Sequence, residues 1–482
     1  MVSVQSRYTV FPSEPTPNEK LFSLCEQIKL RTHAPLLYVY KPHPGHNAST
    51  FVNTLRHSLS QALAIYYPLA GRLSLIEGAK WEVHCNAKGA QLLEANCEGA
   101  KSLNELGDFV PAHLVSQLIP HVDYDVPVED TPLLIAQLTR FSFGGVTIGL
   151  ALCRAVIDGT ATMRFMSTWA KLARREKLDR NEMTPCHDRT MLNSYKVNSR
   201  LTLYDHLEFG APPLWLGPLG ENKVEVAIVK LTDEQVKKLK HEGNKNQNTT
   251  ITSTSTPRPY STFEVVAGYL WKCVSKARHA GNSEQRTRLS TLVNCRNRMS
   301  PPLVGYAGNA VFPTVTPTCS FGEIMHRPLS YAVGNVRVAL ESVTGDFVAS
   351  ALDHIDREKD MNLVRYNIHY PAPSVRKGRP YEGNPNLFVV SWMNFSFKDA
   401  DFGWGHPLYF GPGYMDSEGK AFVMNVANGD GLVVAISLEA SHMDAFKKFF
   451  YGDVQEEFRD TLMRRNEEND KQSPSSCSRR TE

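Results

Sequence analysis

The stretch Asp399-Ala400-Asp401-Phe402-Gly403-Trp404-Gly405 is the most distinctive part of this 482-residue sequence. Two carboxylates, two aromatic rings and two glycines fall within seven residues. Glycine permits a strained turn or a close backbone approach, and a short acidic side chain accepts hydrogen bonds from nearby N–H groups. Two interpretations follow: a structured turn held by its own aspartate, or part of a functional site.

A second unusual stretch is Asp158-Gly159. It follows an apolar run at 146–152 and precedes a helical pattern that extends to about residue 174. An acidic residue near a helix start is stabilised by the helix dipole, which is the ordinary interpretation. The alternative is that this strand-to-helix junction carries a functional residue.

The composition is ordinary for a globular protein: 42% of the residues are hydrophobic, 21% are charged and the net charge is +3. The 53 basic and 50 acidic residues argue against a dedicated nucleic-acid binder. No apolar run has the length of a membrane span, and no secretory signal is evident, so we expect a cytoplasmic protein without a membrane partner. The nine scattered cysteines form no CxxC pair, which indicates a reduced protein without a zinc site.

Short apolar or alternating runs predict strands, and apolar residues at helical spacing predict helices. The predicted strands are 81–84, 133–138, 146–152, 224–231, 387–391, 422–425 and 432–437. The predicted helices are 50–67, 159–174, 232–242, 261–271 and 441–450. Thr232 with Gln235, and Ser261 with Glu264, have the spacing of capping boxes.

These patterns predict a two-domain α/β protein. The first domain is expected at 1–185, followed by a proline-containing crossover at 186–220. The second domain is expected at 221–463, with a stretch near 385–410 that could be exchanged onto the first. A polar flexible tail is expected at 464–482. The chain lacks the GxSxG, Walker A, HExxH and strand-linked GxGxxG patterns, which disfavours simple hydrolases, nucleotide triphosphatases, zincins and Rossmann enzymes.

Asp401 to Gly405 is also the DFGWG signature of the BAHD family, plant acyl-CoA-dependent acyltransferases, and the chain resembles that family along nearly its whole length. Further matching stretches are Leu59–Leu63, Tyr66–Leu73, Asp130–Leu134, Gln137–Phe141, Asn294–Arg298 and Ser391-Trp392. Within the family, Pro120–Tyr124 and Asp205–Phe209 resemble the spermidine hydroxycinnamoyl transferases most.

The resemblance implies two similarly built α/β domains of the chloramphenicol acetyltransferase type with a solvent channel between them. It implies an acyl-CoA co-substrate and an amine or alcohol acceptor, such as a polyamine or an alkaloid-like amine, in plant specialised metabolism. No bound cofactor and no metal are implied, and the expected state is a monomer.

The family's HxxxDG motif maps onto Arg154, Asp158 and Gly159. In the family the histidine is the general base, and the aspartate is held by an arginine of the second domain, for which Arg296 and Arg298 are the candidates. The resemblance also makes the DFGWG loop mainly structural. The remaining candidate binding or structural residues are Ser391, Trp392, Asp401, Gly403, Trp404 and Gly405.

Arg154 stands where the resemblance places the catalytic histidine. Its pKa lies above about 12, so it cannot act as a base near neutral pH. His406, directly after the DFGWG loop, is a candidate substitute base. Three hypotheses remain: acyl transfer to an amine with a changed mechanism, altered chemistry in which Arg154 binds an anionic group, or a catalytically silent relative that binds a ligand or partner. Each predicts that Arg154 faces the channel and that Asp158 faces away from it.

Two other residue types near these motifs have simpler interpretations. Cys153 precedes Arg154 but ends an apolar run, so we expect a buried thiol and not a nucleophile. Lys237, Lys238 and Lys240 are expected on a solvated helix face and not in a clamp for CoA.

Overall fold

The computed structural model describes residues 1–41, 48–98, 109–110, 113–193, 204–217, 223–245, 258–279, 281–369, 383–426, 429 and 431–452. The tail predicted at 464–482 and part of the crossover predicted at 186–220 lie outside the described residues. In the described part of the crossover, Cys186 forms a parallel bridge with Tyr306.

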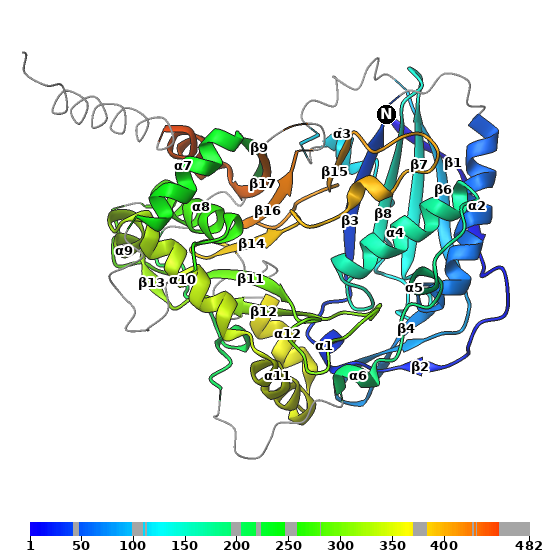
Figure 1. Cartoon of the computed structure of the whole chain (residues 1–482), viewed down its shortest axis with the longest axis horizontal. Helices are drawn as coiled ribbons and strands as arrows, with labels where there is room; N and C mark the ends of the chain where they lie inside the picture. Colours follow the sequence, from blue (N-terminus) through cyan, green and yellow to red (C-terminus); the bar gives the residue numbers. More distant parts are fainter. Residues whose placement is uncertain are drawn as a thin grey trace, which may run out of the picture.

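The first sheet has six strands in the order β1-β6-β7-β8-β3-β15 (Figure 1). Their bounds are β1 Val2–Val10, β6 Ala90–Cys97, β7 Leu134–Phe141, β8 Val146–Cys153, β3 His33–Tyr40 and β15 Tyr409–Pro412. All neighbours are antiparallel except β6 and β7. The last strand, β15, comes from the C-terminal part of the chain, so the chain returns to the first sheet after building most of the second.

The second sheet also has six strands, in the order β12-β11-β14-β16-β17-β9. Their bounds are β12 Val311–Val315, β11 Leu289–Asn294, β14 Leu387–Ser391, β16 Lys420–Asn425, β17 Leu432–Glu439 and β9 Val224–Leu231. The three strands β11, β14 and β16 run parallel, and the others are antiparallel. Two smaller sheets pair β2 (Lys20–Leu21), β5 (Lys80–His84) and β4 (Arg72–Ile76), and β10 (Arg286–Thr287) with β13 (Cys319–Ser320).

Helices cover each large sheet. On the first sheet, α2 (Ala48–Ile65) and α4 (Gly159–Ala173) pack side by side, and on the second, α8 (Thr262–Arg278) and α10 (Leu329–Ser342) do the same (Figure 1). The other helices are α1 Leu24–Gln27, α3 His113–Ser116, α5 Arg180–Met183, α6 Thr190–Asn193, α7 Asp233–Asn244, α9 Phe321–His326, α11 Gly345–Arg357, α12 Met361–His369 and a last one at 440–452.

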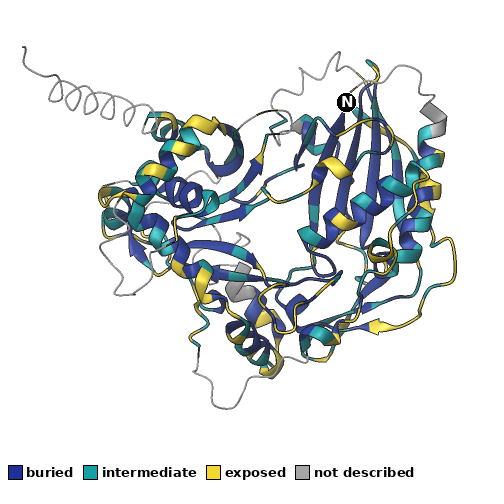
Figure 2. Cartoon of the chain, in the orientation of Figure 1, coloured by how far each residue is buried: buried dark blue, intermediate teal, exposed yellow. Residues whose placement is uncertain are grey.

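The central strands β7, β8 and β3 of the first sheet are buried on both faces (Figure 2). In β3 the side chains of Leu36, Tyr38 and Tyr40 join the core under α2 and α4, whereas Leu37 and Val39 join a smaller core on the other face. This alternation is the two-residue period of a strand. Because both faces are apolar, β3 carries no polar alternation that would mark it in the sequence.

The predicted two-domain mixed α/β fold is confirmed. The predicted strands at 224–231 and 387–391 have the observed bounds of β9 and β14, and both predicted capping boxes close with side-chain and backbone bonds. The helix predicted to end at 271 continues to Arg278 because Cys273 and Val274 extend its buried face. Among the helices of the described residues, none is long and apolar enough to cross a membrane.

Candidate active site

The junction between β8 and α4 is built by local capping chemistry. β8 ends at Cys153, a turn follows, and Asp158 is the N-cap of α4 with extended backbone at φ −93° and ψ 176°. Its Oδ1 accepts a hydrogen bond from the backbone N–H of Ala161 at 3.0 Å. Asp158 therefore satisfies one of the N–H groups that a helix start leaves unpaired.

The same carboxylate joins the two domains. Arg296 donates from Nη1 to Oδ2 of Asp158 at 2.7 Å and from Nη2 to Oδ1 at 3.1 Å. The N–H of Ala310 donates to Oδ2 at 2.9 Å. Asp158 is 5% exposed and Arg296 4%, so this is a buried, two-pronged ion pair. With both oxygens occupied, Asp158 is a structural residue that points toward the second domain.

Arg296 is further fixed by the carbonyls of Tyr306 and Gly308, which accept from Nη2 at 3.1 and 2.8 Å. The other predicted candidate, Arg298, is not the partner of Asp158. Its Nη1 donates to the carbonyls of Leu340 and Val343, each at 2.6 Å. The two arginines are two residues apart in a turn, and only the tertiary structure separates their roles.

Arg154 lies in this turn with its backbone held and its side chain exposed. Its N–H donates to the carbonyl of Thr32 at 2.9 Å, and its carbonyl accepts from Nδ2 of Asn309 at 3.1 Å. Within the described residues the guanidinium has no hydrogen-bond or ion-pair partner. Burial lowers the pKa values of Lys29 and His33, and the charge of Arg154 lowers them further. The same charge opposes the rise that burial causes in the pKa of Tyr124, so all three groups lie within electrostatic reach of Arg154.

His33 is a buried neighbour of Arg154 that the sequence patterns did not mark. Its Nε2 lies 2.9 Å from the carbonyl of Pro132 and its Nδ1 lies 2.9 Å from the hydroxyl of Tyr124. Since a carbonyl only accepts, Nε2 carries the proton and Nδ1 accepts from Tyr124. Burial, with the charges of Arg154 and Arg31, lowers the pKa of His33 to about 4. This imidazole is neutral and held on both sides.

Lys29 is a second residue that the sequence reasoning missed, because a single lysine in a short polar segment gives no signal. It follows α1 and is partly exposed. Burial and the Arg154 charge lower its pKa, against the opposing effects of Cys25 and Asp158. A lysine in these surroundings tends toward the neutral amine.

Cys153 is a buried thiol, as the sequence predicts. It is 1% exposed, and burial raises its pKa to about 12. A thiol with that pKa is almost entirely protonated at neutral pH and is a poor nucleophile.

The DFGWG loop is held by its own aspartate. Oδ1 of Asp401 accepts from the N–H groups of Gly403, Trp404 and Gly405 at 2.8, 3.1 and 3.0 Å. Gly403 and Gly405 have φ values of 93° and 86°, which side chains rarely adopt. The buried ring of Trp404 packs edge-on against Tyr40 with the ring centroids 5.2 Å apart. These contacts make the loop a structural element.

The loop lies at the far end of β3 from Arg154. The hydroxyl of Tyr40 donates to the carbonyl of Ala400 at 2.7 Å, whereas His33, at the start of the same strand, pairs with Cys153. Seven residues of strand separate the two ends, which is roughly 23 Å. His406 belongs to the loop and its Nδ1 lies 2.8 Å from the carbonyl of Lys398. This position in the loop does not support the prediction of His406 as a substitute base.

The segment after β14 docks onto the start of α4. Trp392 stacks on Phe395 with centroids 5.8 Å apart, and the ring of Phe395 lies against Gly159. A Cβ at Gly159 would come within 2.3 Å of that ring. Ser391 accepts from the N–H of Met393 through its hydroxyl at 3.4 Å. Gly159 and Trp392 thus belong to the contact between the two domains, whereas the Ser391 hydroxyl is bonded within its own segment.

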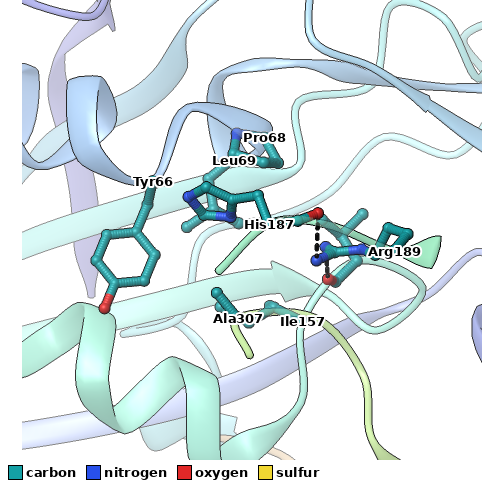
Figure 3. Close-up of a pocket in the computed structure, with 8 residues that line it drawn as sticks. Tyr66, Pro68, Leu69, Ile157, His187, Arg189 and Ala307 are labelled. Carbon is teal, nitrogen blue, oxygen red and sulfur yellow. Dashed lines mark hydrogen bonds between the residues drawn. The ribbon is translucent and has the colours of Figure 1, made fainter. Parts of the chain in front are cut away.

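A small pocket lies behind the turn, lined by Tyr66, Pro68, Leu69, Val156, Ile157, His187, Arg189 and Ala307 (Figure 3). Its free space is about 10 Å³, room for about one water molecule. Arg189 forms a buried ion pair with Glu26 at 3.0 Å, and the pKa of Glu26 is raised by burial to about 7. The pocket is too small for a substrate, so it belongs to the support of the turn. The described residues contain no cluster of metal-ligating side chains.

Comparisons with known proteins agree with this geometry. A model of the Transferase family matches residues 1–453. Hydroxycinnamoyl-CoA:piscidic acid hydroxycinnamoyltransferase of Actaea racemosa is 38% identical over 463 residues, covering 94% of this chain and 100% of that protein. Anthranilate N-benzoyltransferase protein 2 of Dianthus caryophyllus is 35% identical over 469 residues, covering 93% and 99%.

The fold has a counterpart of known structure. The crystal structure of vinorine synthase superposes with a TM-score of 0.66 at 22% sequence identity and covers 92% of this chain and 96% of that chain. The family match over nearly the whole chain and these relatives show that the chain belongs to the Transferase family, the BAHD acyl-CoA-dependent acyltransferases.

Proposed function

We propose that this chain transfers an acyl group from acyl-CoA to a small acceptor that carries a carboxylate beside its amine or hydroxyl nucleophile, with Arg154 binding the carboxylate. The observation that carries the proposal is the exposed guanidinium of Arg154 at the domain junction, unpaired among the described residues. A fixed cation with five donors is complementary to a carboxylate. Arg154 would then be a binding residue at the position of the family's general base.

The relatives support an acidic acceptor. Their printed names give piscidic acid and anthranilate as acceptors, both carboxylic acids, and anthranilate is acylated on nitrogen. The spermidine-type acceptor that the resemblance predicts is less compatible with this site. A polyamine is a polycation, and Arg154 supplies a charge of the same sign with no carboxylate beside it in the described structure. An aromatic or aliphatic amino acid or hydroxy acid supplies both the carboxylate and the amine or hydroxyl nucleophile.

The reaction itself is acyl transfer between sulfur and nitrogen or oxygen. The acceptor's nitrogen or oxygen bonds to the thioester carbonyl carbon, and the bond from that carbon to sulfur breaks. The proton of the nucleophile ends on the CoA sulfur, so the products are the amide or ester and free CoA. Arg154 cannot accept that proton, so its role in this proposal is to orient the acceptor and to balance its charge.

The test compares two acceptors that differ only in the carboxylate. With benzoyl-CoA or a hydroxycinnamoyl-CoA as donor, kcat/KM is measured for anthranilate, for aniline and for spermidine, in the parent and in Arg154→Gln. A charge-assisted hydrogen bond contributes about 1.5–3 kcal/mol, which corresponds to about a 10- to 100-fold preference for anthranilate over aniline. We expect that preference in the parent and its loss in Arg154→Gln.

The alternatives give different results. A parent that prefers spermidine over anthranilate would contradict the acidic acceptor and favour the polyamine. An equal preference for anthranilate in the parent and in Arg154→Gln would remove Arg154 from acceptor binding. The absence of turnover with every acceptor would favour the catalytically silent relative.

A further inference from the structure

Lys29 and Arg154 lie on neighbouring backbone segments that are fixed to each other. The N–H of Lys29 donates to the carbonyl of Glu26 at 3.1 Å, and its carbonyl accepts from Nε1 of Trp81 at 2.9 Å. Three residues later the carbonyl of Thr32 accepts from the N–H of Arg154. The chain then enters β3, which is paired with β8. Lys29 is therefore held beside the turn that carries Arg154 and Asp158.

The amine of Lys29 has no partner for a positive charge. Within the described residues it forms no hydrogen bond and no ion pair, and the charged or titratable groups that act on it are Cys25, Asp158, Arg154 and Cys295. Burial raises the pKa of Cys295 to about 12 and raises that of Cys25 further, so both thiols are neutral near pH 7.

The only carboxylate among those groups is Asp158, and its oxygens are already occupied by Arg296, Ala161 and Ala310. Arg154 is itself a cation. An ammonium at Lys29 would therefore be a second, uncompensated charge in a partly buried cluster, which costs free energy. These surroundings disfavour the ammonium, and burial lowers the pKa of Lys29 in the same direction.

We propose that the neutral amine of Lys29 is the proton acceptor of the acyl transfer. The proposal rests on the proposed function, because it needs an acceptor bound at Arg154. When the acceptor's nitrogen or oxygen bonds to the thioester carbon, its proton moves to Nζ of Lys29. The ammonium then returns that proton to the sulfur of CoA as the carbon–sulfur bond breaks, so Lys29 is neutral again and no other reactant is consumed.

The other titratable groups near Arg154 are less suited to this role. Asp158 has no free oxygen, and the lone pair of His33 is occupied by Tyr124. The hydroxyls of Tyr124 and Tyr414 are protonated at neutral pH, since burial raises both pKa values, that of Tyr124 to about 12. Lys29 alone among these described groups combines a partly exposed position, a free lone pair and no competing hydrogen bond.

The arrangement gives Arg154 a second effect. Its fixed charge opposes protonation of Lys29 and so keeps the amine available as a base. An acceptor carboxylate bound to Arg154 would bring the nucleophile into the same cluster. Arg154 occupies the position of the family's histidine base, and its charge keeps the Lys29 amine available as a base instead.

The first experiment separates a base from a structural cation. Acyl transfer to anthranilate is measured in the parent, in Lys29→Arg and in Lys29→Met, with Lys177→Met as a matched control at an exposed lysine. Arginine keeps the positive charge but cannot be a base at neutral pH. We expect kcat to fall about 100-fold or more in both Lys29 variants, with KM for anthranilate changed only a few-fold and the control unchanged. A Lys29→Arg variant that retains kcat within about threefold of the parent would overturn the proposal.

The second experiment does not depend on turnover. The parent is labelled with a trace of acetic anhydride across pH 6–10, and the labelling of Lys29 and Lys177 is followed by peptide mass spectrometry. We expect Lys29 to label at a lower pH than Lys177, and its midpoint to rise in Arg154→Gln. Equal labelling profiles for the two lysines would overturn the proposal even if the chain is active. A parent without turnover but with an early Lys29 midpoint would instead remove the proposed function, and with it the base role, while retaining the neutral amine.

Discussion

Replacing Asp158 by alanine should destabilise the folded chain by about 5 kcal/mol, because one side chain serves three buried partners. It pairs with Arg296, caps α4 through Ala161 and accepts from the N–H of Ala310. Both members of the ion pair are nearly sealed from solvent. Water cannot replace the lost contacts unless the domains separate.

The magnitude follows from the separate contributions. Removing one partner of a buried pair leaves an uncompensated charge and costs about 3–5 kcal/mol. Loss of an N-cap costs about 1 kcal/mol, and an unpaired buried N–H costs about 1–3 kcal/mol. The three effects arise from one carboxylate and are not additive, so we take the lower end of their summed range, about 5 kcal/mol. Asp158→Asn keeps an oxygen for the cap and should cost about 3 kcal/mol.

The assay is urea-induced unfolding at pH 7, followed by tryptophan fluorescence. The matched control is Asp179→Ala, which removes the N-cap of α5 at an exposed position where the carboxylate accepts from the N–H of Glu182 at 2.9 Å. That control should cost about 1 kcal/mol or less. A cycle with Arg296→Met and Asp158→Asn should give a coupling of about 2–3 kcal/mol. If Asp158→Ala were no more destabilising than Asp179→Ala, the buried link between the domains would be refuted.

Three further predictions concern residues around the site. His33 has a folded pKa of about 4, below its unfolded value of about 6.5, so the unfolded chain binds more protons between these pH values. Its stabilising contribution of about 3 kcal/mol is therefore present above pH 6.5 and lost as the pH falls toward 4. Between these two pH values, His33→Gln should lose less free energy of unfolding than the parent, by about that amount. Trp404→Ala should lower the free energy of unfolding by about 3–5 kcal/mol. At a temperature where the variant is folded, its kcat should stay within a few-fold of the parent. A fall in kcat of about 100-fold would contradict a structural role for the loop. Asp401→Ala removes an acceptor from three N–H groups that lie partly in solvent, so thermal unfolding should show a smaller cost of about 1–2 kcal/mol.

Local chemistry explains which parts of the fold could be predicted. The strand at 224–231 is flanked by polar residues, and the strand at 387–391 is a compact apolar run that begins after Asn386. The capping boxes at Thr232 and Ser261 depend only on residues three positions apart. β3 could not be predicted from alternation, because both its faces are buried and it contains Pro35. The return of β15 to the first sheet depends on pairing with β3 across more than 360 residues, which no local pattern encodes.

The candidate site likewise contains residues that the sequence marks and residues that it does not. Asp158 and the DFGWG loop carry spacing that marks them in the sequence, and the structure gives both a structural role. The choice of Arg296 over Arg298 depends on which guanidinium reaches Asp158 and the carbonyls of Tyr306 and Gly308. Lys29 has no sequence signal at all, because its properties come from burial and from a charge more than 120 residues away in the chain.

The most direct test of the account is acyl transfer by the unmodified chain with Arg154 in place. Purified protein is given a hydroxycinnamoyl-CoA and anthranilate, and free CoA and the acylated product are measured together against a blank without acceptor, with Arg154→His in parallel. We expect acceptor-dependent release of CoA and an equal amount of product from the parent. Turnover by Arg154→His alone, with none by the parent, would contradict it, because the position would then need the histidine that this chain lacks.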